Sequence, residues 1–110
     1  METQEYEGWT NRETWATMLH IDNDEGLSEL ALYYARQELD GLDDGEEVNV
    51  YHFSETIKSW IEDELLTFEN IAQGNHGLWL MLTDIGSLYR VNWREIAESL
   101  LQNAKESVNA

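Results

Sequence analysis

Carboxylates are the side chains that could carry out chemistry in this sequence. It contains 23 Asp and Glu residues against six Lys and Arg residues, which gives a formal net charge of −17 at pH 7. Carboxylates bind metal ions, transfer protons or attract basic partners, and their spacing decides between these roles. The candidate contact residues are Glu25, Glu29, Asp40, Asp43, Asp44, Glu46, Glu47, Glu55, Glu62 and Asp63.

The acidic segment 40–51 shares part of its pattern with a calcium-binding EF-hand loop. Its first and fifth residues are aspartates and its sixth is a glycine, as in such a loop. However, Leu42 occupies the third position, and Tyr51 replaces the glutamate that binds calcium through both oxygens at the twelfth. A second acidic segment, 22–26, places its glycine one residue early. We therefore expect no dedicated calcium site.

The other side chains with catalytic or metal-binding potential form no known arrangement. The absence of cysteine excludes disulfides, thiolate metal sites and a cysteine nucleophile. His20, His52 and His76 are scattered, and none belongs to a metal-binding histidine pair. There is no phosphate-binding glycine loop, and no Ser-His-Asp order stands out. We therefore expect neither an enzyme nor a bound cofactor or metal.

The spacing of the acids suggests a binding surface. Glu25 and Glu29 are four residues apart on one predicted helix, and the acids 62–64 fall together on another. A helix rises ~1.5 Å per residue, so acids one turn apart form a ladder with steps of ~6 Å. Such a ladder fits a row of phosphate-like charges that faces a basic partner. It fits equally well a solvated surface, such as that of a halophile or of a protein selected for solubility.

An all-α fold is predicted, a small bundle of about five helices around a central apolar helix at residues 78–89. That stretch is apolar over most of its circumference, so other elements must surround it. At twelve residues it is too short to cross a bilayer, which requires ~20 apolar residues, and no membrane association is expected. Within it, Gly86 is expected to allow a neighbouring element to approach closely.

Amphipathic helices are expected to surround this stretch. A capping box at Thr10 opens the first helix, Asp22 or Asn23 opens the second, and Gly41 ends the second. The expected ranges are 10–21, 22–41, 54–68 and 92–104. The side chains expected to face inward on the third helix are Phe53, Ile57, Trp60, Ile61, Leu65 and Phe68. A short strand at residues 48–51 is the alternative for that segment.

Length and composition predict a single acidic helical domain that covers residues 1–110. A hydrophobic content of 42% with five tryptophans is sufficient for a packed core, so the acidity does not indicate disorder. The first residues have neither a basic start nor an apolar run, so we expect no signal peptide and a cytoplasmic location.

Three blocks of the sequence resemble a family of short proteins from phages, plasmids and related mobile elements. The blocks are 8–15 (GWTNRETW), 23–27 (NDEGL) and 91–100 (VNWREIAESL). The resemblance supplies no catalytic residues. It implies a mobile-element setting inside a host cell, where small and very acidic proteins often inhibit host defences by imitating DNA.

The leading hypothesis is therefore a DNA mimic that inhibits a nucleic-acid-binding defence protein, such as a CRISPR effector or a restriction enzyme. The acids would occupy a basic groove on that partner, and the protein itself would not bind nucleic acid because it has no basic patch. The alternative is an acidic adaptor or regulator that docks on a partner protein through an aromatic or apolar patch. A mimic needs a continuous negative face, whereas an adaptor needs an exposed apolar patch.

Overall fold

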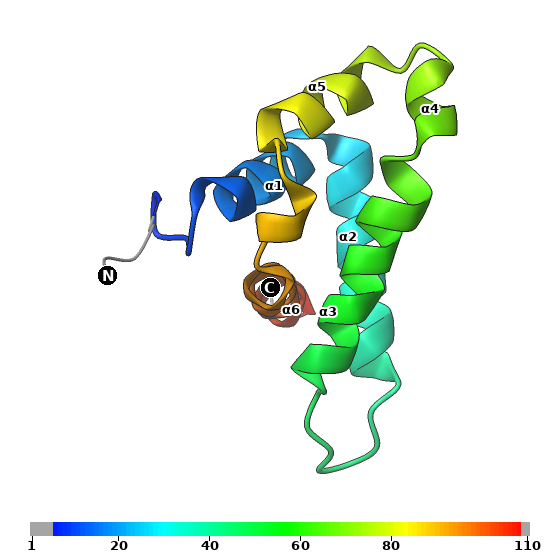
Figure 1. The fold of residues 1–110 in the computed structure, drawn as a ribbon. Coiled ribbons are helices and arrows are strands. Elements are labelled where there is room, and N and C mark those ends of the chain that lie inside the picture. Colours follow the sequence, from blue (N-terminus) through cyan, green and yellow to red (C-terminus); the bar gives the residue numbers. More distant parts are fainter. Residues whose placement is uncertain (1–5, 109–110) are drawn as a thin grey trace.

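The computed structural model describes residues 6–108, which fold into packed helices (Figure 1). A π-helix, η1, directly continues α3, and a short 3₁₀-helix, η2, precedes α6. The elements are α1 (Arg12–Asn23), α2 (Glu25–Asp40), α3 (Val50–Ser59), η1 (Trp60–Leu65), α4 (Phe68–Ala72), α5 (His76–Ile85), η2 (Leu88–Arg90) and α6 (Trp93–Val108). Residues 6–108 contain no β-strand, only an isolated bridge between Tyr6 and Trp9. The predicted small all-α bundle is confirmed.

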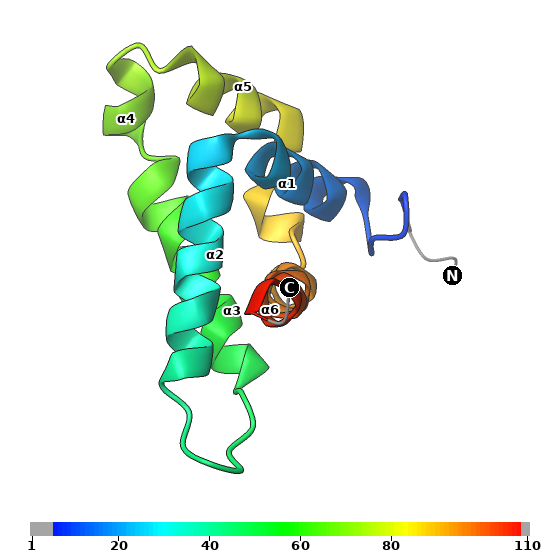
Figure 2. The same ribbon diagram turned by 180° about the vertical axis from the view of Figure 1, so that it is seen from behind.

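Helix α6 is the element around which the core forms. It packs against α1, α2 and α3, and Figures 1 and 2 show it nearly end-on between α1 and the α2–α3 pair. The apolar stripe predicted for this helix is buried, and its side chains are Trp93, Ile96, Ala97, Leu100, Leu101 and Ala104. As predicted, Asn92 caps the helix, because its Oδ1 accepts a hydrogen bond from the Glu95 N–H at 3.1 Å. A helix with one apolar face is therefore sufficient to centre the bundle.

The helix predicted as central, residues 78–89, corresponds to α5 but lies at the edge of the bundle. It packs mainly on α1 and α4, which cover only part of its circumference. Trp79 and Leu80 are 48% and 45% exposed, so their predicted place in the core is wrong. The buried side chains of this helix are Leu78, Met81 and Ile85. A helix with apolar residues on most of its sides is therefore not necessarily the helix that the other helices enclose.

Helix α5 also ends earlier than predicted, at Ile85. The following residue, Gly86, has a φ of +83°, a left-handed conformation that glycine adopts without the steric cost of a side chain. No atom lies within 4 Å of the position that a Cβ would take on this glycine. Gly86 therefore serves the turn of the backbone, and the predicted close approach of a neighbour is wrong.

The first two helices begin with different capping residues from those predicted. Asn11, one residue after Thr10, caps α1 by accepting a hydrogen bond from the Thr14 N–H at 2.9 Å. Asp24 caps α2 by accepting from the Leu27 N–H at 3.0 Å. Asn and Asp are at least as favourable at this position as Thr, so neighbouring candidates compete. The predicted end of α2 at Gly41 is confirmed.

The third helix begins at Val50, where Asn49 caps it, so residues 48–51 form no strand. Its final turns widen into η1, in which the Leu66 N–H donates to the Ile61 carbonyl five residues earlier. The chain then turns at Thr67, and Phe68 opens α4 with its side chain 87% exposed. The predicted inward orientation of Phe68 is therefore wrong, because the helix that would have turned it inward ends before it.

Candidate protein-binding surface

The α2–α3 hairpin carries all ten predicted contact residues. Helices α2 and α3 run side by side in opposite directions and are joined by the loop 41–49 (Figures 1 and 2). Glu25, Glu29 and Asp40 belong to α2, Glu55 to α3, and Glu62 and Asp63 to η1, while the loop contributes Asp43, Asp44, Glu46 and Glu47. Residues 25–65 hold twelve carboxylates and only two basic side chains. The fold therefore gathers acids from a long stretch of sequence on one hairpin.

These ten side chains are accessible to a partner. All are exposed except Glu62, which is half-buried. Two accept local hydrogen bonds: Asp63 from the Ser59 hydroxyl at 3.2 Å and Glu46 from the Asp43 N–H at 2.8 Å. Within residues 6–108, none of the ten forms an ion pair. Within the described residues, the charge of these ten carboxylates thus faces solvent or a basic partner.

Three of the six basic residues neutralise acids outside the hairpin. Arg12 pairs with Asp84 at 3.0 Å, Arg90 pairs with Glu13 at 3.3 Å, and a third pair joins Arg94 and Glu98 within α6 at 3.6 Å. All three pairs lie on α1, α5, η2 or α6. The charge of the molecule is therefore unevenly distributed, and the α2–α3 hairpin is its most negative part.

Two hollows lie along the α2–α3 hairpin, and together they are called the groove. One hollow of about 360 Å³ is lined by Tyr34, His52, Glu55, Thr56, Ser59, Trp60 and Glu64. Another of about 290 Å³, at the loop end, is lined by Gln37, Glu38, Gly41, Leu42, Glu46, Glu47 and Asn49. His52 Nδ1 lies 3.2 Å from Glu38 Oε2, which links the linings of the two hollows. Both hollows therefore have carboxylates in their lining.

Two acidic residues of this groove, Glu38 and Glu64, were not among the predicted contact residues. Glu38 follows Tyr34 by one helical turn on α2, so it lies on the same face, toward α3. Burial raises the pKa of the Tyr34 phenol, and the Glu64 carboxylate and Tyr33 raise it further. Glu64 thus acts electrostatically on a ring of the opposite helix. The helical spacing from Tyr34 could have indicated Glu38, but the placement of Glu64 in the same hollow as Tyr34 depends on how α2 and η1 pack.

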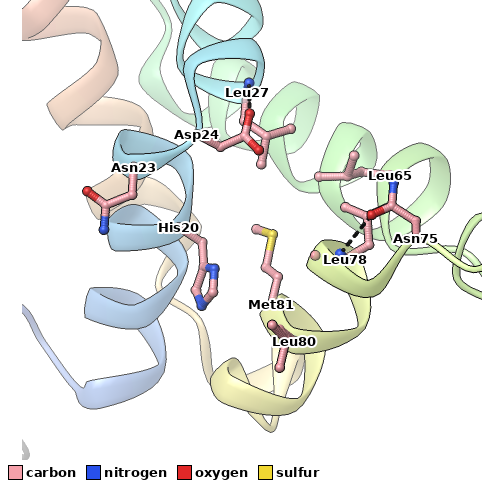
Figure 3. A pocket seen from close by; sticks show the side chains of 10 residues that line it. His20, Asn23, Asp24, Leu27, Leu65, Asn75, Leu78, Leu80 and Met81 are labelled. Carbon is pink, nitrogen blue, oxygen red and sulfur yellow. Dashed lines mark hydrogen bonds between the residues drawn. The ribbon is translucent and has the colours of Figure 1, made fainter.

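A third hollow, of about 370 Å³, lies where the junction of α1 and α2 meets α5 (Figure 3). The side chains around it come from α1, α2, η1 and α5, as Figure 3 shows. Its lining consists of His20, Asn23, Asp24, Leu27, Leu65, Asn75, Gly77, Leu78, Leu80 and Met81. Trp79, which is exposed, belongs to α5. Helix α5 therefore offers apolar surface in addition to the side chains that line this hollow.

The three histidines take part in separate local contacts. His20 Nε2 lies 2.9 Å from Asp84 Oδ2, and Arg12 holds the other oxygen of that carboxylate, which fastens α1 to α5. His76 stacks on Trp79 with ring centroids 5.8 Å apart, while His52 contacts α2. In the described part of the chain, no three His, Asp or Glu side chains lie close enough together to hold a metal ion.

Fold and surface together define a small all-α protein whose α2–α3 hairpin carries a large excess of acidic over basic residues. Residues 2–106 match the family of unknown function DUF7249, and the chain belongs to that family. No curated protein and no solved structure matches the chain significantly. Across residues 6–108, no helix is long and apolar enough to cross a membrane.

Proposed function

We propose that this protein is an inhibitor that binds a basic, nucleic-acid-binding defence protein of a host cell, of the CRISPR-effector or restriction-enzyme kind. The observation that supports this proposal most strongly is that the ten predicted contact residues lie on one hairpin and form no ion pair among residues 6–108. A surface of this kind is complementary to a groove of Lys and Arg residues that normally holds phosphates.

The α2–α3 hairpin competes by taking the place of a nucleic-acid backbone. Glu25 and Glu29 are separated by about 6 Å along α2, close to the axial distance between alternate phosphates of one DNA strand, which is about 7 Å. The net charge of −17 steers the encounter with a positive partner and repels nucleic acid itself. The protein acts by binding, without a catalytic step or a cofactor, in the cytoplasm of a host cell that carries the mobile element.

Cleavage of DNA by candidate defence nucleases tests this function. A purified nuclease that the protein inhibits should recover its activity when Asp43, Asp44, Glu46 and Glu47 are all changed to Lys, or when Glu25 and Glu29 are changed to Lys. Inhibition that survives both changes would contradict the proposal.

A matched control exists for the α2 variant. Glu98 and Glu106 are exposed on α6, outside the hairpin, and their replacement by Lys changes the net charge by the same amount as that of Glu25 and Glu29. This control variant should still inhibit. If it loses inhibition to the same extent, total charge and not the hairpin would determine binding.

A second candidate function is that of an acidic adaptor that docks on a partner protein through an apolar patch. The observation that favours it is the exposure of Trp79 and Leu80 on α5, a helix that also borders the 370 Å³ hollow. An adaptor should lose its partner when Trp79 and Leu80 are changed to Ser. It should be almost indifferent to charge reversal in the loop 41–49.

A further inference from the structure

We infer that the groove between α2 and α3 receives an arginine side chain of the partner protein, with the guanidinium placed on the ring of Tyr34 and facing Glu64. This inference rests on the proposed function and adds to it. It assigns a specific site within an acidic surface that would otherwise attract any basic protein. The chemical class of the ligand is a guanidinium group on a basic polypeptide segment.

The aromatic part of this site is preorganised. Tyr34 is half-buried on α2, and its ring centroid lies 5.4 Å from that of Trp60, with 51° between the ring planes. Trp60 is 3% exposed and belongs to the core, so the Tyr34 ring packs against a buried side chain. Both residues line the hollow of about 360 Å³. A cation is attracted to an aromatic face, and a ring that already packs against the core loses little freedom when it binds.

The rim of the hollow provides the negative charge. Glu64 lies near enough to Tyr34 to raise the pKa of its phenol together with burial, and Glu55 lines the same hollow. Neither carboxylate forms an ion pair within residues 6–108. Glu55 and Glu64 are nine positions apart, which is on the order of 13 Å along the helix axis. An extended chain covers that distance with about four residues. A partner segment with a second basic residue about four positions away could therefore contact both.

An arginine fits this hollow better than a lysine or a metal ion does. The guanidinium is planar, stacks on aromatic rings and donates two parallel hydrogen bonds to a carboxylate, whereas an ammonium is compact and strongly hydrated. The two acids of this hollow do not belong to a group that could hold a metal ion, because residues 6–108 contain no such group. The hydroxyls of Thr56 and Ser59 add polar groups to the lining.

The test compares two nine-residue peptides, one of arginine and one of lysine, whose binding to the full chain is measured by calorimetry at one fixed salt concentration. We expect the arginine peptide to bind about three to ten times more tightly, because the guanidinium stacks on the ring and donates paired hydrogen bonds, which an ammonium cannot do. Tyr34→Leu keeps an apolar side chain over Trp60 and should bring this ratio close to one. Tyr33→Leu removes the neighbouring ring, which is 55% exposed and outside the hollow, and should leave the ratio unchanged.

A second pair of variants tests the carboxylate without changing the packing. Glu64→Gln should weaken the binding of the arginine peptide more than Glu62→Gln does. Both variants remove one charge, but only Glu64 lines the hollow. Equal binding of the two peptides to the parent protein, or a ratio that survives Tyr34→Leu, would overturn the arginine site. In that case binding by charge alone would remain. If neither peptide bound even at low salt, both the arginine site and the proposed function would be contradicted.

Discussion

The hydroxyl of Thr14 on α1 accepts a hydrogen bond from the backbone N–H of Asn92 at 2.8 Å, across 78 residues of sequence. The same hydroxyl donates to Asn11 Oδ1 at 2.7 Å, and Asn11 Nδ2 donates to the Arg90 carbonyl at 2.8 Å. Two of the three distinctive sequence blocks, 8–15 and 91–100, therefore meet in space. Their polar residues join the start of α1 to the start of α6, so this part of the pattern is structural.

Thr14→Val should destabilise the fold. The substitution keeps the shape of the side chain but leaves the Asn92 N–H and one Asn11 oxygen lone pair without their partner in a buried place, at a cost of about 1–3 kcal/mol. This loss of stability is measured as the decrease in the free energy of unfolding in urea denaturation. Thr83→Val on α5 is the control, because the exposed Thr83 bonds only to carbonyls of its own helix. Equal losses in both variants would contradict the role given to Thr14.

Core substitutions distinguish the two helices that could centre the bundle. Ile96 on α6 is fully buried, so Ile96→Ala should cost about 2–5 kcal/mol, a large part of the ~5–15 kcal/mol that stabilises a domain. Trp79→Ala on α5 removes a half-exposed ring and should cost clearly less. Thermal melting followed by circular dichroism compares them. A lower melting temperature for Trp79→Ala than for Ile96→Ala would place α5, and not α6, at the centre.

The contrast between α6 and α5 shows what the sequence can and cannot predict. The stripe of α6 repeats at helical spacing and alternates with charged residues, so its inner face and its cap at Asn92 could be predicted. The apolar residues of α5 surround the helix, and which of them are covered depends on where α1 and α4 pack. The acids of the hairpin could be located by residue type. The groove at Tyr34 could not, because it requires the pairing of α2 with α3 and η1.

Alkaline titration tests the environment of Tyr34. Its pKa is raised by burial, then by Glu64 and Tyr33, so the folded protein holds this proton more strongly than the unfolded chain, in which tyrosine has a pKa of ~10. The resulting stability is fully present below pH ~10 and is lost as pH rises through the raised pKa of the folded state. In the tyrosinate absorbance, the component that Tyr34→Phe removes should therefore titrate above the ordinary tyrosine pKa.

The contribution of Glu64 to that titration has its own control. Glu64→Gln removes a negative charge that disfavours the phenolate, so it should lower the pKa of Tyr34 toward the ordinary tyrosine value. Burial should keep it somewhat raised. Glu62→Gln should have a smaller effect, because Glu62 is not among the groups that raise this pKa. An unchanged pKa of Tyr34 in the Glu64→Gln variant would contradict the electrostatic effect of Glu64 on Tyr34.

The most direct test of the central claim is competition for a nuclease that the protein inhibits. A fluorescent DNA bound to that nuclease should be displaced by the protein, and the affinity should fall steeply between about 50 and 500 mM salt, because surface charges interact over ~10 Å at 0.1 M and less at higher concentrations. Reversing Asp43, Asp44, Glu46 and Glu47 to Lys should abolish displacement while the helical spectrum is retained. Binding that leaves the DNA in place and is equally strong at both salt concentrations would contradict the claim that the hairpin stands in for a nucleic-acid backbone.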